Sequence, residues 1–383
     1  MIKFGKNRIR VLYVVENRSF GGGERGFGQL STNLNNNRFQ PFLTAHPGGK
    51  LEEIAQRAGI TFFPVDMSRK VNFKTIGYLS RLISAHQIHI VHSMGARADF
   101  FARMASRNKP STAVVCTLAM LVEGFDVGFL RKFFYKLADR YSARYVTQYI
   151  TVSKALKARL ISERIIHADK ISVIYNGVEL DQYNPELYRP LEARLSLGIT
   201  DDYPIVGTIG RLVYQKGFSH FLKAAKHVYN ENNQIRFVIV GHGPEDAKLK
   251  HLADSLGILP VCKFVGSRFN VAEILSAFDV FVLSSVLEGS PRVVIEAMAM
   301  ARPIVATDID GVREQINDNR TGLLVKPANP KLLATAIMEL LHDKQKANHL
   351  ASKAHEYAKR NFDLTLTINK IENLYEHLYE SIS

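Results

Sequence analysis

The sequence predicts an α/β protein of two doubly wound domains, each with a parallel sheet covered by helices on both faces. Three observations support this prediction: a length of 383 residues, a regular alternation of short apolar runs with helical patterns, and a second start of that alternation halfway along the chain. A chain of this length exceeds what one ordinary core contains. Strands that alternate with helices favour parallel sheets, and two successive sets favour two domains.

Short apolar runs mark the expected strands in both halves. Those of the first half are Ile9–Val15, Phe39–Ala45, Thr61–Val65, His89–His92, Ala113–Thr117, Tyr149–Val152 and Ile171–Ile174. Those of the second half are Ile205–Ile209, Arg236–Val240, Lys263–Val265, Val280–Leu283 and Pro303–Ala306. Turn-forming pairs and polar residues gather between Asn176 and Pro204. We therefore predict one domain over residues 1–178 and a second over residues 179–362.

The composition excludes several classes of protein. Hydrophobic residues make up 46% and charged residues 22%, which is typical of a globular chain. No apolar run reaches the roughly 18 residues of a membrane span, and the basic start leads directly into a strand without a signal-peptide core. We expect a cytoplasmic protein. Cys116 and Cys262 lie far apart in apolar runs, and we expect buried, reduced thiols at both positions.

Positive charge is confined to the first half of the sequence. Residues 1–180 contain 27 Lys and Arg against 12 Asp and Glu, whereas residues 181–383 contain 23 against 24. This asymmetry predicts an anionic partner for the first half, either anionic lipid or a phosphorylated acceptor. Nucleic acid is disfavoured, because no recognised nucleic-acid-binding motif is present. Residues 129–141 form a basic amphipathic helix, which either packs on the core with a solvated back or attaches to an anionic membrane surface.

A glycine cluster follows the first strand and leads into a helical pattern from about Glu24 to Asn35. Gly21, Gly23 and Gly26 match G-x-G-x-x-G. A dinucleotide site of this kind requires an acidic residue near the end of the second strand, and none is present there. The glycines therefore favour a phosphate-binding helix start, with a purely structural turn as the alternative.

Two motifs of the second half point to an anionic ligand. Arg211 and Lys216 lie in one loop after a predicted strand, where both can reach a ligand at the carboxyl end of the sheet. Glu288 and Glu296 are separated by seven residues, and we expect Ser290 to be the N-cap of the helix between them. The start of that helix would bind a diphosphate, and the carboxylates would accept hydrogen bonds from sugar or ribose hydroxyls.

In their order and spacing these motifs resemble family 4 of the retaining glycosyltransferases, whose fold is called GT-B. The resemblance runs nearly from end to end, through Gly21–Glu24, His89–Ser93, Ile150–Ser153, Val173–Val178, Gly207–Arg211 with Lys216 and Gly217, Gly241–Pro244, Phe264–Gly266, Glu288–Glu296, Gly311–Glu314 and Thr321–Val325. It implies two Rossmann-like domains that face each other across a cleft. It also implies that the last helix, within residues 363–383, packs back on the first domain, and that a nucleotide-diphosphate sugar is the donor, without a metal or another cofactor.

The resemblance also implies roles for individual residues. Arg211, Lys216 and Glu288 would be catalytic, the first two on the donor diphosphate and the third at the donor sugar. The donor-binding set would be Gly22, Gly23, Gly210, Val265, Gly266, Arg268, Gly289, Ser290, Pro291 and Glu296. Within it, Gly22 and Gly23 would cover the phosphates, Val265–Arg268 would contact the base, and Glu296 would contact the ribose. Glu24, His92 and Arg97 are expected on the acceptor side.

Two positions need separate interpretation. The family usually has a histidine after the fifth strand, where this chain has Ala119. Asp308 and Asp310 match the Asp-x-Asp of metal-dependent transferases, but they precede Gly311 in a loop where the family uses no metal. We expect no metal there, because Arg, Lys and a helix dipole already supply positive charge.

The expected function is transfer of a hexose-type sugar, with retention of configuration, to a glycan or glycolipid acceptor in cell-envelope polysaccharide or lipopolysaccharide synthesis. The protein would act in the cytoplasm, as a peripheral protein on the inner face of the cytoplasmic membrane. Two alternatives on the same fold remain: a nucleotide-sugar epimerase and a non-catalytic nucleotide-sugar-binding protein. The Ala119 departure supports the second of these alternatives.

Overall fold

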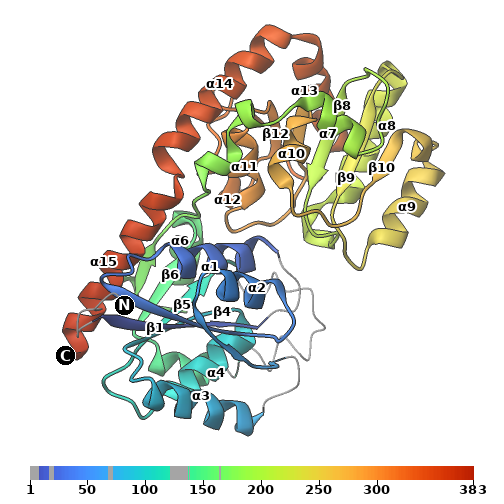
Figure 1. The fold of residues 1–383 in the computed structure, drawn as a ribbon. Coiled ribbons are helices and arrows are strands. Elements are labelled where there is room, and N and C mark those ends of the chain that lie inside the picture. Colours follow the sequence, from blue (N-terminus) through green and yellow to red (C-terminus); the bar gives the residue numbers. More distant parts are fainter. Residues whose placement is uncertain (1–7, 17–20, 68–71, 121–136, 138, 164) are drawn as a thin grey trace. The chain divides into compact units, whose positions relative to one another are not determined.

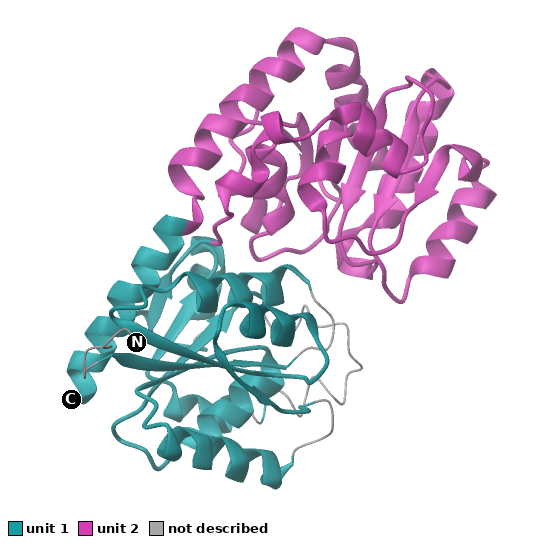
Figure 2. Cartoon of the chain, in the orientation of Figure 1, with its two compact units in different colours: residues 1–175, 365–383 teal, residues 176–364 magenta. Residues whose placement is uncertain are grey.

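The chain folds into two compact units in the computed structural model, which describes residues 8–16, 21–67, 72–120, 137, 139–163 and 165–383. Unit 1 comprises residues 1–175 and 365–383, and unit 2 comprises residues 176–364 (Figure 2). The last helix therefore belongs to the unit that contains the N-terminus. Among the residues that the structure describes, no helix has the length and apolar character needed to span a bilayer.

Unit 1 is built on a parallel sheet whose described strands follow the order β3-β2-β1-β4-β5-β6-β7. The strands are β1 (Ile9–Val15), β2 (Phe39–Ala45), β3 (Thr61–Pro64), β4 (Ile90–Met94), β5 (Ala113–Leu118), β6 (Gln148–Thr151) and β7 (Ile171–Val173). The described α-helices are α1 (Gly22–Asn33), α2 (Lys50–Arg57), α3 (Phe73–Ala85), α4 (Ala96–Ser106), α6 (Lys154–Ser162) and α15 (Leu364–Ile382). In Figure 1, α3 and α4 lie on one face of the sheet, and α1 and α2 on the other.

Unit 2 repeats this scheme with the parallel strand order β10-β9-β8-β11-β12-β13. Its strands are β8 (Ile205–Ile209), β9 (Arg236–Val240), β10 (Cys262–Phe264), β11 (Val280–Leu283), β12 (Ile304–Thr307) and β13 (Leu323–Val325). Its α-helices are α7 (Pro190–Ser196), α8 (Phe218–Glu231), α9 (Asp246–Ser255), α10 (Val271–Ser276), α11 (Arg292–Ala299), α12 (Asp310–Arg313), α13 (Pro330–His342) and α14 (Lys344–Asn361). The strand order reverses between β8 and β11, and ligands of such sheets bind beside that point, at the carboxyl ends of the strands.

The C-terminal helix α15 is attached to unit 1 by buried polar contacts. Tyr375 is fully buried, and its hydroxyl lies 2.5 Å from Nδ1 of His92 and 3.3 Å from the hydroxyl of Tyr13. One turn earlier, the carboxylate of Glu372 accepts a hydrogen bond of 2.7 Å from the backbone N–H of Asn35. The predicted fold class, including a last helix that returns to the first domain, is thus confirmed.

Three smaller predictions can be compared with the structure. Strand β13, of three residues, was not among the predicted strands. Both cysteines are unpaired and buried, as predicted, and burial raises the pKa of each thiol to about 12. The predicted basic helix over residues 129–141 lies mostly outside the described residues. Its described members Leu137 and Tyr141 are 57% and 53% exposed.

Candidate functional site

The loop after β8 is held rigidly against the loop after β9. The backbone N–H of Gly210 donates to the carbonyl of Val240 at 2.9 Å, and that of Leu212 donates to the carbonyl of His242 at 3.1 Å. Gly241 has a φ of +144°, and a Cβ there would lie 1.8 Å from the carbonyl oxygen of Gly210, so only glycine fits. The loop presents Arg211 as an exposed side chain, for which no ion pair is found among the described residues.

Lys216 and Glu288 join the loop after β8 to the loop after β11. The Nζ of Lys216 donates to Oε1 of Glu288 at 2.5 Å, and the hydroxyl of Ser285 donates to the same oxygen at 2.8 Å. A Cβ on Gly217 would lie 2.0 Å from the carbonyl oxygen of Ser284, so the two loops touch directly. Because the side chain of Glu288 is only 6% exposed, its charge is balanced mainly by Lys216. The pair fixes an ammonium group at the carboxyl edge of the sheet.

Helix α11 begins without a capping side chain. The expected N-cap, Ser290, is wrong: the helix starts at Arg292, and Pro291 is its N-cap residue. The hydroxyl of Ser290 instead accepts a hydrogen bond of 2.9 Å from Nε2 of Gln315. The positive end of the helix dipole is thus not covered by a side-chain cap, and anions are stabilised at such an end. Glu296, in the middle of α11, is buried.

Helix α12 packs closely against the loop that contains Glu288. A Cβ on Gly311 would lie 2.3 Å from the carbonyl oxygen of Gly289, which explains the glycine. Asp308 and Asp310 both pair with Arg313, and the bond from Arg313 holds the pKa of Asp308 below its usual value. No group of three or more potential metal ligands is found among the described residues.

The segment expected to contact the base lies beside the loop that carries Arg211. The backbone N–H of Val265 donates to the carbonyl of Ile239 at 3.0 Å, and the carbonyl of Gly266 accepts from Gly241 at 2.9 Å. Gly266 has a φ of +67°, and Arg268 is exposed. The loops after β8, β9 and β10 are therefore hydrogen bonded in series along one edge of the sheet of unit 2.

The predicted residues of unit 1 lie at the starts of two helices. Gly22 and Gly23 form the first turn of α1, and Glu24 accepts a hydrogen bond of 2.9 Å from the backbone N–H of Gly21, so it caps that helix. The backbone N–H groups of Arg97 and Ala98 donate to Glu16 at 2.5 and 3.1 Å. The side chain of Arg97 lies 3.6 Å from the same carboxylate. Glu16, which no sequence motif singled out, directly follows β1 and caps α4.

His92 is a core residue, and its expected place on the acceptor side is wrong. The ring is fully buried, with Nδ1 bonded to the hydroxyl of Tyr375 and Nε2 lying 2.7 Å from the hydroxyl of Thr117. Burial lowers the pKa of His92 to about 3, so the ring is neutral at physiological pH. Its function is to join β4 to β5 and α15. Ala119, one residue beyond the end of β5, is exposed.

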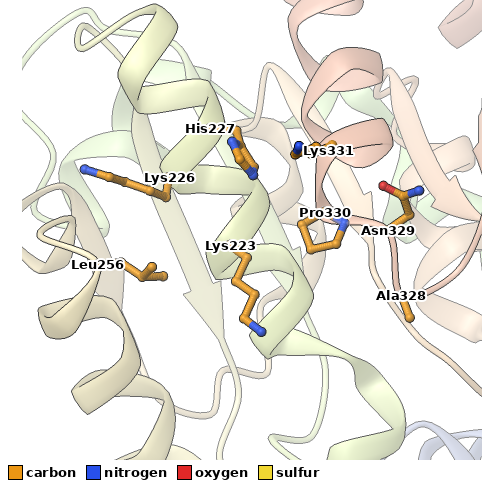
Figure 3. Close-up of a pocket in the computed structure, with 8 residues that line it drawn as sticks. All are labelled: Lys223, Lys226, His227, Leu256, Ala328, Asn329, Pro330 and Lys331. Carbon is orange, nitrogen blue, oxygen red and sulfur yellow. The ribbon is translucent and has the colours of Figure 1, made fainter.

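A separate cavity of about 590 Å³ lies on the helical surface of unit 2, between α8 and α13 (Figure 3). It is lined by Lys223, Lys226, His227, Leu256, Ala328, Asn329, Pro330 and Lys331. The side chains of Lys223 and Lys226 point in different directions in Figure 3, and none of the predicted donor residues lines the cavity. The candidate site is therefore the edge that contains Arg211, Lys216, Glu288 and the start of α11.

Comparison with known proteins gives matches over both units. The model of the family described as Glycosyltransferase Family 4 matches residues 20–182, and that described as Glycosyl transferases group 1 matches residues 191–357. The chain is 27% identical to UDP-Gal:alpha-D-GlcNAc-diphosphoundecaprenol alpha-1,3-galactosyltransferase of Escherichia coli, over 98% of each chain. It is 28% identical to N,N'-diacetylbacillosaminyl-diphospho-undecaprenol alpha-1,3-N-acetylgalactosaminyltransferase of Campylobacter jejuni, over 82% of this chain and 83% of that protein.

Solved structures agree on the fold. The crystal structure of HepE from Anabaena in complex with UDP and glucose has a TM-score of 0.84 and 21% identity, and the match covers 97% of this chain and all of HepE. Together, the strand order of both units, the residues at the edge of unit 2 and the two family matches lead to one assignment. The chain belongs to the glycosyltransferases of family 4 and group 1, which have the GT-B fold.

Proposed function

We propose that the protein transfers a hexose-type sugar, with retention of configuration, from a nucleoside-diphosphate sugar held by unit 2. The observation that carries this proposal is the Lys216–Glu288 ion pair beside the start of α11, which has no side-chain cap. A fixed ammonium group and a helix dipole at one edge are suited to a diphosphate. Arg211, exposed in the loop that also contains Lys216, adds a third source of positive charge.

The proposed chemistry follows from this charge arrangement. The bond between C1 of the sugar and the diphosphate oxygen breaks, and negative charge grows on the leaving phosphate while the sugar becomes oxocarbenium-like. Preorganised positive groups stabilise such a charge more strongly than the ground state. Arg211, Lys216 and the start of α11 would do so here. An acceptor hydroxyl oxygen then forms the new bond to C1 from the face that the nucleotide leaves, and its proton passes to the departing phosphate oxygen.

The two carboxylates of unit 2 would position the donor. Oε1 of Glu288 already accepts from Lys216 and Ser285, and no hydrogen bond to Oε2 is found among the described residues. That oxygen is suited to a sugar hydroxyl. Glu296, four residues after the first residue of α11, is proposed to accept from the ribose. Gly22, Gly23 and the backbone of Val265–Arg268 complete the proposed donor set.

We further propose that the reaction needs no metal. Arg313 already pairs with both Asp308 and Asp310, which offsets part of their negative charge without a cation. Positive charge for the leaving group is supplied by side chains and a helix, which can replace a divalent ion.

The proposed acceptor is a lipid-linked glycan or lipid diphosphate in cell-envelope synthesis. The relatives from Escherichia coli and Campylobacter jejuni both carry diphosphoundecaprenol substrates in their names. In this chain, unit 1 contains 28 Lys and Arg against 14 Asp and Glu, whereas unit 2 contains 22 of each. A basic unit is suited to a phosphorylated lipid at an anionic membrane surface. The exposed Leu137 and Tyr141, beside Arg140 and Arg144, would contact that surface.

The direct test is a transfer assay on the purified full chain. A panel of UDP-, GDP- and ADP-sugars labelled in the sugar would be incubated with and without extracted lipid-linked acceptors. We expect the label to move to the lipid only when acceptor is present. Sugar isomerisation without acceptor would instead indicate the epimerase, and tight binding without turnover would indicate the non-catalytic protein.

A further inference from the structure

Two side-chain amides hold Ser290, the residue between the Glu288 loop and α11. Nε2 of Gln315 donates to the hydroxyl oxygen of Ser290 at 2.9 Å. Nδ2 of Asn176, the first residue of unit 2, donates to the carbonyl oxygen of Ser290 at 3.0 Å. The side chain and the backbone of one residue are thus fixed by different segments, one after α12 and one at the beginning of the unit.

Gln315 is a polar residue in a buried, apolar environment, which is unfavourable for the stability of the fold. It is 1% exposed, and its neighbours Val312 and Ile316 are 0% and 1% exposed. Its Oε1 atom is buried, and no hydrogen-bond partner for it is found among the described residues, which include all of unit 2. A buried amide with an unfilled acceptor is less stable than an apolar side chain of the same size. Packing alone therefore does not explain a glutamine at this position.

The bond from Gln315 determines what the Ser290 hydroxyl can do. A serine hydroxyl has one hydrogen to donate and two lone pairs that accept. Because its oxygen accepts from Gln315, its hydrogen remains for another group. No acceptor for that hydrogen is found among the described residues, and Ser290 is partly exposed. The hydroxyl lies two residues after Glu288 and directly before the helix end suited to a diphosphate.

We propose that Gln315 is a positioning residue that orients the Ser290 hydroxyl to donate a hydrogen bond to an oxygen of the bound donor. This inference rests on the proposed function of unit 2 and deepens it. It names a residue that raises the affinity for the donor through Ser290, without contacting the donor itself. The oxygen belongs either to the diphosphate or to a sugar hydroxyl. Both accept a hydrogen bond in the same way, and the experiment separates them.

The test is a double-mutant cycle on the full chain, with Ser290→Ala, Gln315→Met and the double variant. Methionine keeps the volume of Gln315 and removes the amide. The probes are UDP-galactose and UDP, titrated calorimetrically; if the panel above selects another base, its sugar and diphosphate replace them. We expect each single variant to weaken binding of UDP-galactose about five- to tenfold, the effect of one hydrogen bond. The double variant should be no weaker than the weaker single variant.

The two probes identify the oxygen. Equal loss for UDP and UDP-galactose assigns it to the diphosphate, and loss for UDP-galactose alone assigns it to the sugar; both results support the proposal. Asn329→Ala is the control, because Asn329 caps α13 through a 3.1 Å bond from Leu332 and has no contact with Ser290. It should lower the melting temperature and leave both affinities unchanged.

Three results would overturn the proposal. The first is a double variant whose loss of affinity equals the product of the two single losses, because Gln315 would then act independently of Ser290. The second is a Gln315→Met variant that resembles Asn329→Ala, with a lower melting temperature and normal affinity. Both leave the proposed function intact, since the wild type still binds the donor. The third is a wild type that binds no nucleotide sugar in the panel, which removes the proposed function as well.

Discussion

The sheets of both units contain the strand order 3-2-1-4-5-6, counted along each unit. The units differ in which of their helix N-termini are capped by carboxylates. In unit 1, carboxylates of the unit itself cap α1 and α4, through Glu24 and Glu16. In unit 2, α11 has no capping side chain, and Arg211 and Lys216 lie at the same edge. At a helix N-terminus capped by a carboxylate, the backbone N–H groups already bind a negative charge. At an uncapped N-terminus these groups are available for an anionic ligand. The comparison favours the proposed place of the donor diphosphate, in unit 2.

The same comparison gives unit 1 a different role. The entire net charge of +14 lies in unit 1, although carboxylates cap the starts of two of its helices, α1 and α4. We propose that this excess of positive charge attracts an extended anionic partner, such as a membrane that carries the acceptor.

The largest expected effect is the loss of Lys216. Lys216→Ala removes the ammonium group from the donor edge and leaves the nearly buried Glu288 without its charge partner. We expect turnover to fall at least about tenfold, and about a hundredfold if the contact strengthens in the transition state. Lys223→Ala, on the exposed face of α8, is the matched control and should retain normal turnover. Normal turnover in Lys216→Ala would contradict the proposal that this edge of unit 2 binds the donor diphosphate.

The second prediction concerns the closed interior of unit 1. The pKa of His92 is lowered by burial to about 3, while an unfolded histidine titrates near its ordinary value of 6.5. Between these values the unfolded chain binds one more proton than the folded chain, so this residue destabilises the fold as pH falls below 6.5. At pH 5 the wild type should lose about 2 kcal/mol of stability through this residue.

Urea unfolding at pH 7.5 and pH 5 checks this loss against His92→Gln, which does not titrate. The difference between the two proteins should shrink by that amount on acidification. An unchanged difference would mean that His92 is accessible to protons in the folded state, and the acceptor role would then need to be reconsidered.

The third prediction sharpens the role of the basic surface. The full chain should bind vesicles that contain anionic lipid and not neutral ones, and the binding should weaken with salt. Arg140→Gln and Arg144→Gln should each weaken it about fivefold, or about 1 kcal/mol. Arg189→Gln, an 82% exposed arginine of unit 2, should have no effect. Sedimentation with vesicles measures all four proteins. If the wild type does not bind anionic vesicles at low salt, a soluble phosphorylated acceptor is the better explanation for the basic residues of unit 1.

The smallest expected effect is that of a chelator. Excess EDTA should leave the transfer rate unchanged, because Asp308 and Asp310 both pair with Arg313 and the proposed charge for the leaving group comes from side chains and a helix. Loss of activity that Mg²⁺ or Mn²⁺ restores would contradict this and would identify the two aspartates as ligands.

Much of the fold was predictable because local patterns determine it. The bounds of β1, β2, β8, β9 and β11 agree with the predicted runs, since buried parallel strands are mostly apolar segments between turns. The last helix was also predicted, within residues 363–383, and α15 is observed over Leu364–Ile382. The Lys216–Glu288 pair could be anticipated only in part: the motifs placed both residues at one sheet edge, and their 2.5 Å contact required the folded loops.

The remaining features depend on contacts between distant segments. The residues around Ser290 are typical of an N-cap, but its hydroxyl is hydrogen bonded to Gln315, which is 25 residues later in the sequence. His92 lies next to a strand end in the sequence, and only α15, 283 residues later, buries its ring. Glu16 directly follows a strand and caps a helix that starts 80 residues later. No pattern within a local window contains these partners.

Hydrogen exchange with and without donor is the most direct test of the assignment of the diphosphate to unit 2. The full chain would be exchanged alone and with a saturating nucleotide sugar, and its peptides measured by mass spectrometry. We predict the strongest new protection in two segments of unit 2, Gly210–Gly217 and Glu288–Glu296. Protection confined to unit 1, with both of these segments unchanged, would contradict the assignment.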